Sequence, residues 1–131
     1  MYSIAVLTKE EQEGRIYRKY ILDYCTEKGI FPLVELYQSQ EKFFEQTRNR
    51  VPDLVFLTLP GVAGLNAAEH LSSLYSGCGI IWCSDLDFSL HAFRLRIEYF
   101  FMEPADAPKI WEGLSAWLEN KIKTKTDFRR K

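Results

Sequence analysis

Short apolar runs alternate along the chain with longer stretches of helical period. Five runs have the length of a β-strand, namely residues 3–7, 31–37, 54–57, 80–83 and 99–102. After each run, apolar residues recur at three- and four-residue steps, as they do on the buried side of an amphipathic helix. This alternation predicts five βα units, and therefore a mainly parallel sheet with helices on both faces, because parallel strands need crossover connections.

The composition of the runs predicts where each strand lies in the sheet. Residues 54–57 (LVFL) and 80–83 (IIWC) are apolar without alternation, which is typical of central strands covered on both faces. Residues 31–37 (FPLVELY) alternate instead, and Pro32 has no N–H to donate to a neighbouring strand. We therefore expect 31–37 to be an edge strand.

The helical stretches carry recognisable ends. Ser39 is suited to cap a short helix, and Gly29 is positioned to end the first one. The last helix is the most strongly amphipathic, with apolar positions at Ile110, Trp111, Leu114, Trp117, Leu118 and Ile122. Five helices are therefore expected, one after each strand.

Composition adds limits to this picture. The 131 residues are 47% hydrophobic, which is enough for one core, and no apolar run approaches the length of a membrane span. Three cysteines cannot all pair, and the N-terminus has no secretion-signal pattern, so we expect a reducing, cytoplasmic setting. Charge divides the chain: residues 121–131 carry a net +5, so the remainder carries −6.

Polar residues follow the predicted strands at the edge where parallel sheets bind ligands. In such sheets, ligands bind outside the carboxyl ends of the strands. Here those positions hold Thr8 and Lys9 after the first strand, Thr58 after the third, Ser84 after the fourth and Glu103 after the fifth. These residues are the candidate site.

Two segments bring a resemblance to a known family. Residues 52–71 (PDLVFLTLPGVAGLNAAEHL) and 91–104 (HAFRLRIEYFFMEP) resemble the corresponding stretches of response-regulator receiver domains, the second most closely those of LytTR-type regulators. The resemblance implies a CheY-like, flavodoxin-like (βα)5 sandwich of order 2-1-3-4-5. It predicts a receiver-like domain at residues 1–122, followed by a basic tail or the start of a linker at 123–131.

The resemblance also implies what a working receiver needs. A carboxylate after the third strand attacks a phosphoryl group, while Mg²⁺ held by two acids and a lysine neutralises its charge. A hydroxyl after the fourth strand completes the set. This chain has Thr58 at the nucleophile position, Thr8 and Lys9 at the acid pair, Ser84 (or, one residue off, Cys83) at the hydroxyl and Glu103 at the lysine.

These replacements predict a receiver that cannot be phosphorylated. A neutral alcohol needs an adjacent base to attack, and Lys9 puts a positive charge where the metal would sit. We therefore expect no catalysis, metal or cofactor. Two alternatives stay open: Glu10 and Glu11 could bind a cation if the first strand ends later, and Lys9 and Glu103 either form an ion pair or are solvated separately.

Other chemistry finds little support. His70 and His91 fall on predicted helices rather than at strand ends, so we assign them no role. Cys78 and Cys83 lack a second pair or a histidine cluster for zinc, and are expected to be apolar thiols. The segment 8–15 (TKEEQEGR) is not the glycine- and hydroxyl-rich loop that an FMN phosphate would need.

The aromatic content of 15% predicts a contact surface. Receivers resembling this chain bind partners through helix four, strand five and helix five. The candidates here are Phe93, Tyr99, Phe101 and Trp111. We expect a protein partner or a homodimer there, with no membrane, and with DNA reached only through a possible output domain absent from this sequence.

The predicted function is therefore a pseudo-receiver, a signalling or transcription-regulatory module that acts by protein contact or dimerisation without phosphorylation. Two alternatives belong to other classes. One is a receiver-like domain that senses a small ligand in the vacated phosphorylation pocket, and the other is an enzyme on a flavodoxin-like fold.

Overall fold

The computed structural model describes residues 1–130, with side chains for residues 1–121. Strands and helices alternate from the N-terminus, as the sequence predicts. In order they are β1 (Ser3–Thr8), α1 (Glu11–Glu27), β2 (Leu33–Tyr37), α2 (Gln40–Thr47), β3 (Leu54–Thr58), α3 (Gly61–Leu74), β4 (Gly79–Ser84), α4 (Ser89–Arg94), β5 (Tyr99–Met102) and α5 (Ala107–Arg130).

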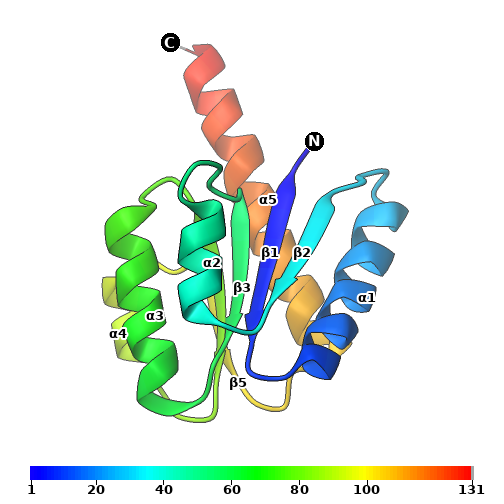
Figure 1. Ribbon diagram of the computed structural model, residues 1–131. Coiled ribbons are helices and arrows are strands. Elements are labelled where there is room, and N and C mark those ends of the chain that lie inside the picture. The colour runs from blue at the N-terminus through cyan, green and yellow to red at the C-terminus, as the bar shows by residue number, and fades with distance from the viewer. Residues whose placement is uncertain (131) are drawn as a thin grey trace.

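All neighbouring strands are parallel, in the order β2-β1-β3-β4-β5, and the predicted flavodoxin-like topology is confirmed. Figure 1 shows α1 and α5 on one side of the sheet and α2, α3 and α4 on the other. The register pairs Thr8 with Thr58 and Ser84 with Met102, so the ends of the strands meet at one edge.

Each strand sends alternate side chains to the two faces. On β1, Ile4 and Val6 join the core under α1 and α5, while Ala5 and Leu7 join the core under α2, α3 and α4. The central strands β3 and β4 are buried along their whole length, whereas β2 alternates between exposed and half-buried residues until the buried Tyr37 at its end. The predicted centre and the predicted edge of the sheet are therefore both confirmed.

The ends of the elements follow local chemistry. The Ser39 hydroxyl accepts from the backbone N–H of Lys42 at 3.3 Å and caps α2, as expected. Gly29 adopts a φ of +74° just after α1, a conformation that costs glycine little. The strand β2 begins two residues later than predicted, directly after Pro32, because proline cannot donate a ladder hydrogen bond.

The backbone of α5 continues to Arg130, through most of the segment predicted as a tail. The division at residue 122 is thus not an end of secondary structure, and the tail as a separate unit stays a prediction. The basic side chains beyond Lys121 lie outside the described side chains. Within the described residues, no helix combines the length and the apolar character that crossing a membrane requires.

Candidate functional site

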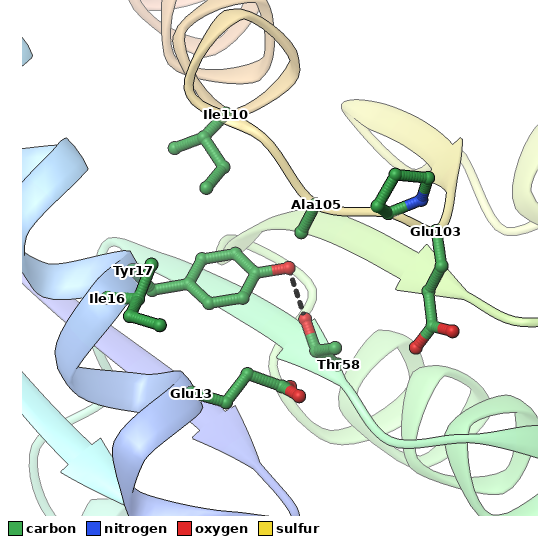
Figure 2. A pocket seen from close by; sticks show the side chains of 8 residues that line it. Glu13, Ile16, Tyr17, Thr58, Glu103, Ala105 and Ile110 are labelled. Atoms are coloured by element: carbon green, nitrogen blue, oxygen red, sulfur yellow. Dashed lines mark hydrogen bonds between the residues drawn. The ribbon is translucent and has the colours of Figure 1, made fainter.

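The position predicted for a phosphate-accepting carboxylate holds a closed pair of hydroxyl groups. Thr58, at the end of β3, is 5% exposed, and its Oγ1 donates to the hydroxyl oxygen of Tyr17 at 2.6 Å (Figure 2). Tyr17 comes from α1, and its ring packs against Phe56 with centroids 5.7 Å apart. The Cys83 thiol on β4 is a further neighbour of the Tyr17 hydroxyl. Both hydroxyl groups are therefore satisfied within the protein.

The ionisation of these groups excludes Tyr17 and Cys83 as bases that could activate Thr58. Burial, followed by the neighbouring Cys83, raises the pKa of Tyr17 well above its usual range. Burial raises the pKa of the Cys83 thiol to about 12. Both groups are neutral at physiological pH, so neither can take the proton of Thr58 and make it a nucleophile.

The two positions predicted for the acid pair, Thr8 at the end of β1 and Lys9 just after it, do not form a metal pocket. Thr8 is completely buried, and its hydroxyl donates to the carbonyl of Glu10 at 2.7 Å. The first turn of α1 packs closely over it, because a Cβ on Gly14 would lie 3.2 Å from the Thr8 hydroxyl. Lys9 is exposed to solvent. In the described residues no three His, Cys, Asp or Glu side chains are grouped to hold a metal ion, so these positions do not fit Mg²⁺.

Ser84 lies at the end of β4 but faces away from Thr58. Its side chain is on the opposite face of β4 from Cys83, since successive residues alternate. The Ser84 hydroxyl accepts from the N–H of Leu86 at 3.1 Å and bonds to the Asp85 carboxylate at 3.4 Å. That carboxylate accepts from the N–H of Gly61 at 2.8 Å, which lowers the pKa of Asp85. Ser84 therefore helps to hold the loop after β4 against the start of α3 at Gly61.

A cavity of about 440 Å³ opens beside the hydroxyl pair. Figure 2 shows side chains from α1, β3, the segment after β5 and α5 around it. Its lining consists of Glu13, Ile16, Tyr17, Thr58, Glu103, Pro104, Ala105 and Ile110. Of the five predicted site residues, the cavity brings together Thr58 and Glu103, whereas Thr8, Lys9 and Ser84 do not line it.

Two carboxylates face this cavity from different elements. Partial burial raises the pKa of Glu13, and the negative charges of Glu103 and Glu10 raise it further. The neighbouring Lys109 ammonium donates instead to the backbone carbonyls of Met102 and Pro104, at 3.2 and 3.0 Å. Two like charges, Glu13 and Glu103, therefore meet at the cavity, whereas one of the alternatives from the sequence was an ion pair between Glu103 and Lys9.

Of the two alternatives for Lys9 and Glu103, the ion pair is not formed. No ion pair joins these two described residues, because the Lys9 side chain extends into solvent and Glu103 faces Glu13 across the cavity. The alternative of an acid pair from Glu10 and Glu11 also fails. The strand β1 does end one residue later than predicted, at Thr8, but Glu11 pairs with Arg15 at 2.9 Å on the exposed side of α1.

Sequence reasoning missed Glu13 and Tyr17 as parts of one site. These residues lie four apart on α1 and so share a face of the helix. That spacing is visible in the sequence, but the apolar period of this stretch indicates only a helix and not which residues face the site. Because α1 begins only a few residues after β1 ends, the side chains in its first turns lie near the carboxyl ends of the strands.

The histidines and the remaining cysteines take structural positions. His70 packs against Phe44, with ring centroids 4.2 Å apart, and His91 against Phe88, with centroids 5.5 Å apart. Burial raises the pKa of Cys25 to about 11 and that of Cys78 to about 12. All three thiols are unpaired.

The four predicted contact residues differ in their exposure. Phe93 on α4 is 82% exposed, whereas Phe101 is only 7% exposed, so the expectation that Phe101 forms a contact surface is wrong. Phe101 faces the core because it follows the alternation of β5. Tyr99 is half-buried and donates to Glu112. The Trp111 Nε1 donates to the Tyr20 carbonyl at 3.0 Å, which places this ring against α1 rather than beside α4.

No protein-family profile and no curated protein matches the sequence. Solved structures do match. A CheY-like receiver domain protein from Methanospirillum hungatei aligns with a TM-score of 0.75 at 15% identity, over 95% of this chain and 98% of its own. The receiver domain of a DNA-binding response regulator from Colwellia psychrerythraea aligns with a TM-score of 0.72 at 13% identity, over 91% and 99%.

A longer protein aligns as well. NtrX from Brucella abortus gives a TM-score of 0.74 at 17% identity over 99% of this chain, which spans 29% of the NtrX chain. Each of these matches rests on the whole arrangement of five strands and five helices rather than on sequence identity. The chain therefore has the fold of response-regulator receiver domains.

Proposed function

We propose that this chain is a pseudo-receiver, a regulatory module that acts by protein contact and is not switched by aspartyl phosphorylation. The observation that carries the proposal is the Thr58–Tyr17 hydroxyl pair, which fills the nucleophile position with two neutral, satisfied groups. A phosphoryl group there would also meet the Glu13 and Glu103 carboxylates, and the described residues that line the cavity include no lysine to offset its charge.

The same chemistry supports a role other than enzymatic. Catalysis at the ends of the strands needs a group able to take or give a proton near neutral pH. The Tyr17 and Cys83 pKa values are both raised by burial, which keeps these groups protonated, and the Thr58 hydroxyl donates to Tyr17 rather than to the Glu13 or Glu103 carboxylate. Regulation then depends on what the domain binds, and DNA is reached only through another domain.

The proposed contact surface includes the exposed side of α4. Leu90 and Phe93 are 57% and 82% exposed, and their three-residue spacing puts them on the same face of the helix. Met102 on the neighbouring edge strand β5 is 41% exposed. Exposed apolar side chains gathered on adjacent elements are typical of a protein interface. Either a second copy or another protein would cover this surface.

Sedimentation velocity tests both parts of the proposal. We expect association that is unchanged by beryllofluoride with Mg²⁺, a mimic of the phosphoryl group. F93S should weaken this association. F31S is a matched control, because Phe31 is 70% exposed but lies just before β2, at the opposite edge of the sheet. A beryllofluoride-dependent shift would contradict the independence from phosphorylation, and equal effects of the two variants would contradict the surface.

A further inference from the structure

The cavity beside Thr58 combines a ligand-sized volume with apolar walls. Its volume of about 440 Å³ falls within the range of small-molecule sites. Ile16 of α1, Ile110 of α5 and the segment Pro104–Ala105 supply aliphatic surface. Figure 2 shows the side chains of Ile16, Ala105 and Ile110 around the cavity. A ligand with a short apolar body would remove this surface from water.

The polar groups of the cavity select the charge of that ligand. The Glu13 and Glu103 carboxylates line it from opposite sides, in Figure 2 on either side of Thr58. Neither forms an ion pair with another described residue, and the nearby Lys109 ammonium is held by two backbone carbonyls. An anion would be repelled here, whereas a cation would relieve the repulsion between the carboxylates.

The floor of the cavity argues for an organic cation rather than a metal ion. Thr58 and Tyr17 bond to each other, so their hydroxyls are not free to complete a coordination shell. Within the described part of the chain, no third acidic, histidine or cysteine side chain joins the two carboxylates to hold a metal. A hard dication needs six or more oxygen ligands, roughly, and keeps water where protein oxygens are missing.

We propose that this cavity binds a small organic monocation, an ammonium or guanidinium group on a short apolar body, with the charged group between Glu13 and Glu103. The inference goes beyond the proposed function, since it names a ligand and does not depend on which protein the domain contacts. Binding would bridge α1 to the segment after β5. It would thereby give the domain an input that needs no phosphate.

Benzylammonium is a suitable probe, because its ring matches the apolar walls and its charge matches the carboxylates. Isothermal titration calorimetry in phosphate buffer, which contains no competing amine, gives the affinity. Amide chemical shifts of Glu103, Ala105 and Ile110 locate the site. Benzyl alcohol has the same body without the charge, and benzoate has the opposite charge. We expect binding of benzylammonium at least about tenfold tighter than of either control compound.

Variants separate the cavity from general charge attraction. E13Q and E103Q should each weaken benzylammonium binding about tenfold. E45Q, on the exposed side of α2, should leave it unchanged. Melting temperatures and amide spectra without ligand check that the variants fold. Equal binding of benzyl alcohol, displacement of the probe by MgCl₂, indifference to E13Q and E103Q, or no shifts at the cavity would each overturn the proposal. None of these results would restore phosphorylation, so the two proposals fail separately.

Discussion

The floor and the mouth of the same cavity have opposite electrostatic character. At the floor, Thr58 and Tyr17 are neutral, deeply buried and bonded to each other. At the mouth, Glu13 and Glu103 carry like charges, and neither forms an ion pair within the described part of the chain. The floor is arranged as a stable core is arranged, whereas the mouth lowers stability. Residues that lower stability are often found at binding sites. The difference therefore suggests that the floor of the cavity has a structural role and that its mouth has a role in binding.

The largest expected effect is on the floor. Y17A removes a fully buried ring that packs on Phe56, and should lower the free energy of unfolding by about 3–5 kcal/mol. Y17F keeps the ring and removes only the hydroxyl, so it should lower that free energy by about 1–2 kcal/mol. Urea unfolding measures both. Equal losses from the two variants would show that the hydroxyl, not the packing, dominates.

Restoring a carboxylate to the floor should destabilise the protein in a pH-dependent way. T58D puts a buried acid near Glu13 and Glu103, and both burial and like charge raise its pKa in the folded state. The destabilisation, about 3 kcal/mol at pH 7, is therefore present above the unfolded pKa of aspartate and shrinks as the pH falls. The neutral variant T58N should lack this pH dependence in urea unfolding. A T58D protein as stable at pH 7 as at pH 4.5 would contradict the acidic environment.

A substitution at the mouth of the cavity should change the free energy of unfolding in the opposite direction, and by a smaller amount. Because the pKa of Glu13 is raised in the folded state, its charged form lowers stability above that pKa, and the penalty disappears as the pH falls below the unfolded value. E13Q should therefore increase the free energy of unfolding at pH 7, by less than about 1 kcal/mol, since the group is largely solvated and the α1 dipole favours an acid.

Thermal unfolding at pH 7 and pH 4 measures this difference. The gain from E13Q should vanish at pH 4 and shrink at high salt, where the repulsion is screened. E45Q provides the control, because its carboxylate lies on α2, away from the cavity. A gain that persists at pH 4 would mean that Glu13 destabilises for a reason other than its charge.

Most of the fold was predictable because each strand and helix has a strong period. The runs LVFL and IIWC identified the centre of the sheet, and Pro32 identified an edge. The start of β2 was placed two residues early, because the apolar Phe31 extends the pattern beyond the point where pairing is possible. Phe101 was misassigned for a related reason: its neighbours on β5 are all apolar, so the sequence does not reveal which faces the core.

The site was only half predictable. Thr58 and Glu103 follow from the ends of their strands, since parallel strands bring those ends to one edge. Glu13 and Tyr17 depend on the rotation of α1 about its own axis, which is set by packing against the sheet and not by local propensity. Cys83 and Ser84 are neighbours in β4, so their side chains lie on opposite faces of the sheet. To tell which of them faces Thr58, the register of β4 must be known.

Intact-mass spectrometry after incubation with acetyl phosphate and Mg²⁺ tests the central claim most directly. A receiver with an aspartate at the nucleophile position, treated in parallel, shows that the reagent is active. We predict that this protein keeps its unmodified mass, because the Thr58 hydroxyl donates to Tyr17 rather than to a carboxylate, and because among the described residues no three acidic, histidine or cysteine side chains are grouped to hold a metal ion. The mass of one added phosphoryl group, mapped to Thr58 or to another residue at the ends of the strands, would contradict the account.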